Sequence, residues 1–102
     1  MLFRSTHEYV KAMSGSVGES FLLGTDLLTS APNAALSLGA LIHHLDFDDT
    51  HAGGLIHATA VSLPAAISVG SALNQTWAEV KTAGIFGLEI ACRIAQIGRA
   101  HV

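Results

Sequence analysis

Charged residues are scarce in this sequence: they make up only 13% of its 102 residues, whereas half of the residues are hydrophobic. Ordinary soluble domains carry about 25% charged residues, and a short chain buries a smaller fraction of its surface than a long one. A composition this apolar predicts a piece of a larger protein, which packs against further protein rather than against water.

Basic residues are absent from the middle of the chain, because Lys81 is the first Lys or Arg after Lys11. Eight acidic residues against five basic ones give a formal net charge of −3. Phosphate contacts need a basic patch, so we expect no nucleic-acid partner.

Cysteine occurs once, at Cys92, which excludes an internal disulfide. A single thiol in a helical pattern is typical of a buried residue in a reducing compartment. Charged and polar residues begin within the first few positions, so the N-terminal segment lacks the apolar core of a signal peptide. We therefore expect a cytoplasmic protein.

One long stretch without charged residues, 52–73, has the length of a membrane span. It contains His57, Pro64 and many small residues, and no Lys or Arg flanks it to set a topology. We expect a buried helix in a soluble bundle here, and no membrane partner.

Three helices are predicted, over residues 34–45, 62–73 and 77–96. Ser30 is a suitable cap for the first, and each proline, Pro32 and Pro64, is expected in a first turn, where its missing N–H is tolerated. We expect a loop over residues 46–55. Residues 1–30 have no clear period and receive no assignment, and no strong strand is predicted. The predicted fold class is all-α, as one piece of a helical bundle.

The third helix has the clearest local signals. Thr76 and Glu79 match a capping box at its start, and Glu89 and Arg93 have the spacing of a favourable ion pair. A stripe of small residues predicts the close approach of another helix. The stripe consists of Val80, Gly84, Gly87 and Ala91.

The last six residues, 97–102, correspond to one translated reading frame of a common sequencing adapter. We interpret them as a library scar that is not native and exclude them from functional reasoning. Residues 1–96 then form one partial domain.

Four of the six histidines lie within fifteen positions, together with three aspartates and a pair of glycines. A carboxylate beside an imidazole can orient the ring, set its tautomer and tune its pKa, as general acid–base chemistry requires. The glycines allow a tight loop that returns His57 toward Asp46. His44 lies on an otherwise apolar helix, which favours a packing role.

Other interpretations of this segment stay open. An EF-hand calcium loop fails, because His51 replaces the required glycine and His57 the bidentate glutamate. The spacing Asp46-x-Asp48-x-Thr50 is that of aspartate-nucleophile phosphatases, but that motif should follow a buried strand rather than a helix. A divalent metal site has no familiar ligand spacing here. The segment can also be a solvated acidic loop at a helix end, with Asp48 and Asp49 as no more than surface charges.

Several separated motifs occur in order over residues 31–96. They are Asn33-Ala34-Ala35-Leu36, Gly39, Ile42-His43-His44-Leu45-Asp46-Phe47-Asp48-Asp49-Thr50-His51, Leu55-Ile56-His57, Ala60-Val61, Leu63-Pro64-Ala65-Ala66 and Gly87-Leu88-Glu89-Ile90-Ala91-Cys92-Arg93-Ile94. In these motifs the sequence resembles the MmgE/PrpD family. One departure is Ala58, where the family usually has proline.

The resemblance implies a fragment of a two-domain enzyme, with an all-α domain and a smaller α+β domain, that forms a homodimer. It implies a lyase such as 2-methylcitrate dehydratase, cis-aconitate decarboxylase or an epimerase, acting beside a carboxylate of a small di- or tricarboxylic acid, and a place in propionate catabolism. Neither a metal nor an organic cofactor is implied. His57 and Asp46 are the expected catalytic residues, and Thr50 and His51 the expected substrate-binding residues. The competing hypothesis is a non-enzymatic helical interaction module.

Overall fold

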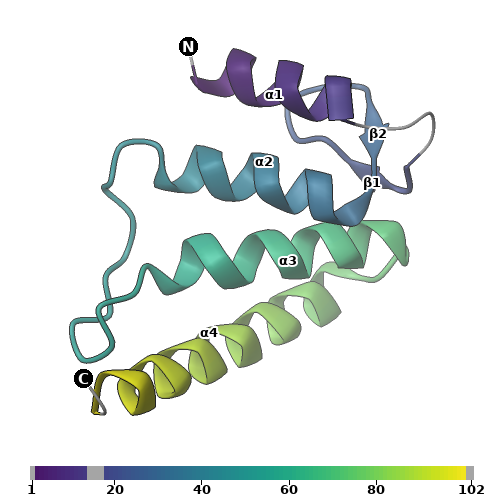
Figure 1. Ribbon diagram of the computed structural model, residues 1–102. Helices are drawn as coiled ribbons and strands as arrows, with labels where there is room; N and C mark the ends of the chain where they lie inside the picture. Colours follow the sequence, from purple (N-terminus) through teal and green to yellow (C-terminus); the bar gives the residue numbers. More distant parts are fainter. Residues whose placement is uncertain (1, 14–17, 101–102) are drawn as a thin grey trace.

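The computed structural model describes residues 2–13 and 18–100, and residues 14–17 of the unassigned segment lie outside the described part. Figure 1 shows helices stacked in chain order, with α3 between α2 and α4 and with α1 against α2. The elements are α1 (Leu2–Met13), β1 (Ser20–Phe21), β2 (Leu28–Thr29), α2 (Ala31–His43), α3 (Ala58–Ala72) and α4 (Trp77–Ala100). The predicted all-α class is confirmed.

The first thirty residues contain structure that sequence patterns did not predict. Arg4 and Glu8 form an i,i+4 ion pair of 3.5 Å on α1, and Val10 is fully buried. The two short strands pair antiparallel as a hairpin. The hairpin is tied to α3, because the Ser20 hydroxyl donates to the Ser68 carbonyl and the Phe21 N–H donates to Ser71 Oγ at 3.1 Å.

The second helix, α2, begins as its capping residue predicts but ends early. Ser30 Oγ accepts a hydrogen bond of 3.4 Å from the Asn33 N–H, and Pro32 lies in the first turn. The helix stops at His43, two residues before the expected end, because Asp46 adopts a positive φ of 51°. Aspartate tolerates this left-handed conformation better than most residues, and its N–H returns to the His43 carbonyl at 3.0 Å.

The predicted start of the next helix was wrong. Because α3 begins at Ala58, Pro64 lies in its interior and not in its first turn. An interior proline removes the hydrogen bond to the carbonyl four residues earlier, here that of Ala60. A Cβ placed on Gly39 of α2 would lie 3.1 Å from this carbonyl oxygen and 3.7 Å from the proline ring. The two helices therefore pack closely beside the buried proline.

The predictions for α4 are confirmed at its start and along its inner face. Glu79 Oε2 accepts from the Thr76 N–H at 2.8 Å while Thr76 Oγ1 accepts from the Glu79 N–H at 3.3 Å, as in a capping box. Cβ atoms built on Gly84 and Gly87 would lie 3.4 Å from Leu63 and 3.1 Å from Ser62, so α3 is the close neighbour. The expected Glu89–Arg93 pair also forms, at 2.6 Å.

The outer face of α4 is apolar and exposed. Large side chains along it are each more than half exposed; they include Ile85, Phe86, Ile90 and Ile94. The helix continues to Ala100, and the last two residues of the segment 97–102 lie outside the described residues. Among the described helices, none combines the length and apolarity that crossing a membrane requires.

Candidate acid–base site

The dense histidine and aspartate segment is the loop between α2 and α3, at one end of the helical stack (Figure 1). The prediction of a loop between two helices, with Asp46 just past the end of the first, is confirmed. The element directly before Asp46 is the helix α2 and not a strand. The aspartate-nucleophile phosphatase hypothesis requires a buried strand directly before Asp46, and this strand is missing from the described chain.

A small turn within the loop uses the ring of His51. The His51 N–H donates to the Ile56 carbonyl at 2.9 Å, and the two residues form an isolated antiparallel bridge. The Gly54 N–H donates to Nδ1 of the same ring at 3.0 Å. Because this nitrogen holds the turn, a substrate-binding role for His51 rests on its other nitrogen and stays a prediction.

The two glycines of this turn provide space rather than backbone freedom. Neither has a positive φ; among the described glycines only Gly24 does. A Cβ on Gly54 would lie 2.6 Å from the Ala95 Cβ on α4, and one on Gly53 would lie 3.0 Å from Gln96 Nε2. The loop can thus lie directly against α4, three residues before His57 at the N-cap position of α3.

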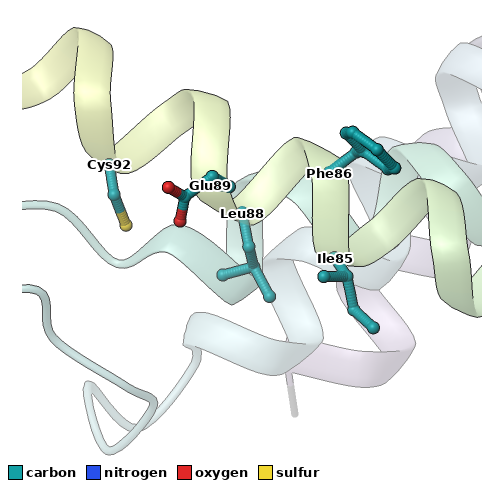
Figure 2. Close-up of a pocket in the computed structure, with 5 residues that line it drawn as sticks. All are labelled: Ile85, Phe86, Leu88, Glu89 and Cys92. Atoms are coloured by element: carbon teal, nitrogen blue, oxygen red, sulfur yellow. The ribbon is translucent and has the colours of Figure 1, made fainter.

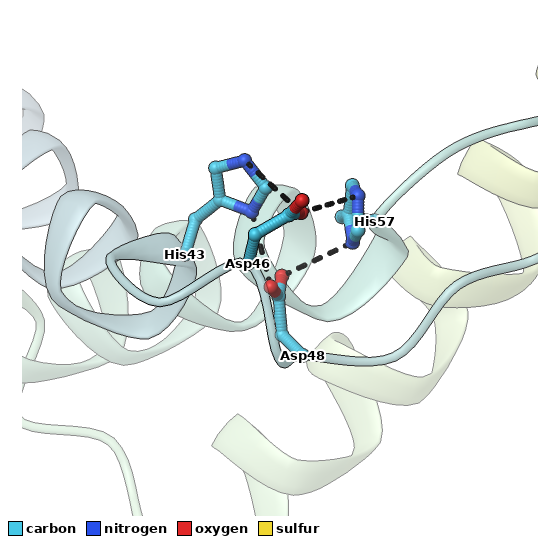
Figure 3. Close-up of side chains that lie close together, drawn as sticks. All are labelled: His43, Asp46, Asp48 and His57. Atoms are coloured by element: carbon cyan, nitrogen blue, oxygen red, sulfur yellow. Dashed lines mark hydrogen bonds and ion pairs between the residues drawn. The ribbon is translucent and has the colours of Figure 1, made fainter.

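Four side chains form a closed ring in which imidazoles and carboxylates alternate (Figure 3). His43 Nδ1 donates to Asp48 Oδ1 at 3.0 Å, and Asp48 Oδ2 lies 3.5 Å from His57 Nδ1. Asp46 Oδ1 lies 3.3 Å from His57 Nε2 and 4.0 Å from His43 Nε2. The two ring centroids are 4.6 Å apart. Helix α2 supplies the first histidine, the loop supplies both carboxylates, and the second histidine precedes α3.

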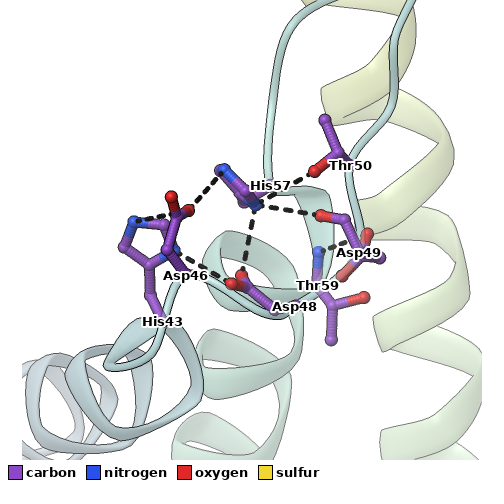
Figure 4. Close-up of polar contacts among 7 residues, drawn as sticks. All are labelled: His43, Asp46, Asp48, Asp49, Thr50, His57 and Thr59. Carbon is purple, nitrogen blue, oxygen red and sulfur yellow. Dashed lines mark hydrogen bonds and ion pairs between the residues drawn. The ribbon is translucent and has the colours of Figure 1, made fainter.

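Both nitrogens of His57 face oxygen atoms that accept hydrogen bonds (Figure 4). Nδ1 lies 3.1 Å from the Asp49 carbonyl oxygen and 3.5 Å from Thr50 Oγ1. Nε2 faces Asp46 Oδ1 at 3.3 Å. In its cationic form the ring donates at both ends, and in its neutral form the Nδ1–H bond to Asp49 leaves the lone pair on Nε2. The Nε2 contact with Asp46 is therefore a hydrogen bond only when this nitrogen carries a proton.

Asp48 is the buried member of the ring, with a side chain only 6% exposed against 76% for Asp46. Burial acts to raise the pKa of the Asp48 carboxyl, but the His43 hydrogen bond, a bond from its own N–H and the nearby imidazoles outweigh it. Its pKa consequently lies below the ordinary value, so the carboxylate is ionised at neutral pH. The interpretation of Asp48 as a mere surface charge is wrong.

The structure brings together three of the four expected site residues. His57 and Asp46 are in contact, and Thr50 lies beside the same imidazole. Sequence reasoning missed His43, although it lies one helical turn before Asp46, a spacing that places two side chains on one face. His44, for which a packing role was favoured, is instead exposed.

An open groove of about 600 Å³ runs between α2 and α3 to this ring. Its only polar lining side chains are His43 and His57; the remaining walls are apolar. Figure 2 shows another hollow, of about 410 Å³, along α4, where Glu89 lies near Cys92 and apolar side chains. That hollow has a carboxylate but no imidazole, whereas the two histidines that line the groove also contact Asp48 and Asp46.

Comparison with known proteins agrees with this geometry at the level of the family. The family model described as the MmgE/PrpD N-terminal domain matches residues 2–101, almost the whole chain. No curated protein and no solved structure matches the sequence. Since the match covers far more than half of the residues, the chain belongs to the MmgE/PrpD family, as its N-terminal helical domain.

Proposed function

We propose that this chain is the N-terminal part of a lyase that resembles 2-methylcitrate dehydratase. Its substrate is a small di- or tricarboxylic acid, and its chemistry is proton transfer beside a substrate carboxylate. The observation that carries the proposal is His57, held between Asp46 and the Asp49 carbonyl at 3.3 and 3.1 Å, at the end of an open groove. Membership of a dehydratase and lyase family supports the same reaction class.

In the proposed reaction, neutral His57 accepts at Nε2 the proton of the carbon next to a carboxylate. The electron pair of that C–H bond moves into the carboxylate as an enediolate. The pair then forms a carbon–carbon double bond while hydroxide leaves the neighbouring carbon and takes the proton back from the His57 imidazolium, which gives water and neutral His57. One positioned acid or base of this kind contributes about 10²–10⁴-fold in rate.

The neighbouring residues have separate proposed roles. Asp46 orients the His57 ring or contacts the substrate, and it is exposed enough to do either. Thr50 lies beside the same imidazole and can donate a hydrogen bond to a substrate carboxylate. Asp48 is the buried member of the four-residue ring, and its hydrogen bond fixes the position of His43, so we give Asp48 a positioning role.

Stabilising the enediolate also requires positive charge. No Lys or Arg of the described residues contacts the histidine and aspartate ring. Arg99 does reach the loop, but it donates to the backbone carbonyls of Ala52 and Gly53. We therefore propose that basic groups outside this chain complete the site. The exposed apolar face of α4 is a surface against which further protein, as in the proposed homodimer, can pack.

The complete enzyme should be incubated in D₂O with 2-methylcitrate, cis-aconitate and a monocarboxylic analogue. We expect one polycarboxylate to be converted, with deuterium at the carbon beside its carboxylate in recovered substrate, and no reaction of the analogue. A folded protein that neither converts nor exchanges any of the acids contradicts the proposal and favours the interaction module.

A further inference from the structure

The histidine and aspartate ring has the size of a metal-binding site. One ligand atom from each of His43, Asp46, Asp48 and His57 can be chosen so that all four lie within 4.8 Å of one another. The nitrogen–oxygen separations around the ring are 3.0, 3.3, 3.5 and 4.0 Å. Tetrahedral zinc with ligands at about 2.0–2.2 Å separates its ligand atoms by about 3.3–3.6 Å. These contacts use both nitrogens of each imidazole, whereas a zinc ion takes one; with one atom per residue the set lies within 4.8 Å, so the side chains must close in around the ion.

Charge and donor type both select a particular cation. Two neutral imidazoles and two carboxylates carry a charge of about −2, which a divalent ion neutralises. Imidazole nitrogen favours zinc and its transition-metal neighbours, whereas Mg²⁺ and Ca²⁺ prefer sites built from oxygen alone. The exposed Asp46 and the half-exposed His43 leave a path for the ion to enter.

A separate observation concerns Asp48, whose side chain is only 6% exposed. Its Oδ2 atom is buried and has no hydrogen-bond donor, and it faces His57 Nδ1 at 3.5 Å. A buried carboxylate oxygen without a donor is costly, because it has lost water and gained no partner. A cation inside the ring would satisfy this oxygen.

We propose that His43, Asp46, Asp48 and His57 bind one zinc ion, and that zinc bound there inhibits the enzyme. Metal binding stands on the ring itself. The inhibition rests on the proposed function: an imidazole that binds a metal through one nitrogen carries its proton on the other, so His57 keeps no free lone pair to accept the substrate proton. Zinc is thus a reversible inhibitor of this site and has no part in the reaction.

Binding is tested on the complete protein, stripped with chelator and titrated with zinc chloride in a calorimeter, with magnesium chloride in parallel. We expect one zinc ion per chain and no magnesium binding. Asp48→Asn and His43→Ala should each weaken zinc binding by at least about tenfold, the lower end of what a supporting residue alone contributes. His44→Ala, the matched control next along the helix, should bind as the parent does. Should His43→Ala fail to fold, His43→Gln replaces it.

Each outcome separates the two proposals. Absence of zinc binding, or binding that His43 and Asp48 variants leave unchanged, overturns the site. Zinc bound at the ring with undiminished turnover overturns the inhibition. We expect zinc to inhibit turnover and chelator to reverse the inhibition. In Asp48→Asn the inhibition should require a higher zinc concentration, by about the same factor as the loss of zinc affinity. Zinc binding by a protein that converts no acid leaves the site in place and contradicts the proposed function alone.

Discussion

The contact between α4 and the loop that joins α2 to α3 predicts that Gly54→Ala damages the proposed site from a distance. The new Cβ would lie 2.6 Å from the Ala95 Cβ, whereas carbon atoms in ordinary contact are about 3.5–4.0 Å apart. The loop must therefore move by about 1 Å, and overpacking of this kind costs about 1–3 kcal/mol. A displacement of about 1 Å at a catalytic group can lower the rate by about 10²-fold.

A second substitution at the same contact should restore the activity of the Gly54→Ala variant. Ala95→Gly removes the methyl group that the new Cβ would meet, at a cost of about 1 kcal/mol for glycine in a helix. In the double variant the loop can return, so kcat should recover toward that of the parent while the thermal midpoint stays lower. Such recovery is the coupling that a double-mutant cycle measures between residues in contact.

The assay is kcat together with thermal unfolding of the complete enzyme, for both single variants and the double variant. Gly53→Ala is the matched control, because the nearest atoms that its Cβ would meet are movable side-chain atoms, the end of Gln96 at 3.0 Å and the His51 ring at 3.1 Å, and no backbone or Cβ atom of α4 is among them. We expect a smaller loss of kcat there. A Gly54→Ala enzyme with parental kcat, or a double variant as slow as the single one, would refute this account of how the loop is held.

Three further predictions follow from other features. The Asp48 carboxyl has a folded-state pKa below its ordinary value of 3.8, so its ionised form stabilises the fold above about that pH, and this stabilisation is lost as pH falls through the folded-state pKa. When thermal midpoints are measured against pH, Asp48→Asn should reduce the fall in stability at acid pH. An unchanged fall would contradict this prediction. The isolated 102-residue chain should be inactive and should self-associate in size-exclusion chromatography through the exposed face of α4; an active monomer would be the opposite result. If residues 97–102 are an adapter scar, the gene downstream of Ile94 should encode a different continuation, and finding the same six codons in the genome would show that they are native.

Local sequence rules correctly predicted the starts of the helices that have a side-chain cap. Ser30 and Thr76 mark helix starts through side-chain oxygens that cap free N–H groups, and both caps form. Pro64 misled the same reasoning, because a proline is tolerated inside a helix when packing against a neighbour such as Gly39 compensates for the lost bond. Tertiary contact, which is not visible in a short window of sequence, decides that case.

The candidate site was predicted in part for a similar reason. His57 and Asp46 could be chosen from a cluster of acid–base residues and from resemblance to a family. Asp48 and His43 could not be paired in advance, because their contact depends on the reversal at Asp46 and on the loop lying against α4. Burial of a single carboxylate inside a polar loop is a property of the folded path and has no periodic signature in the sequence.

The central claim is that His57 transfers the proton, and its most direct test compares His57→Ala with His44→Ala in the complete enzyme. Both are histidines at the same end of the bundle, but His57 contacts Asp46 and the Asp49 carbonyl whereas His44 is an exposed residue outside the ring. Measured on folded, dimer-checked protein with the converted polycarboxylate, kcat should fall by about 10²–10⁴-fold for His57→Ala and stay near the parental value for His44→Ala. Equal losses in the two variants, or a nearly normal His57→Ala enzyme, would contradict the account.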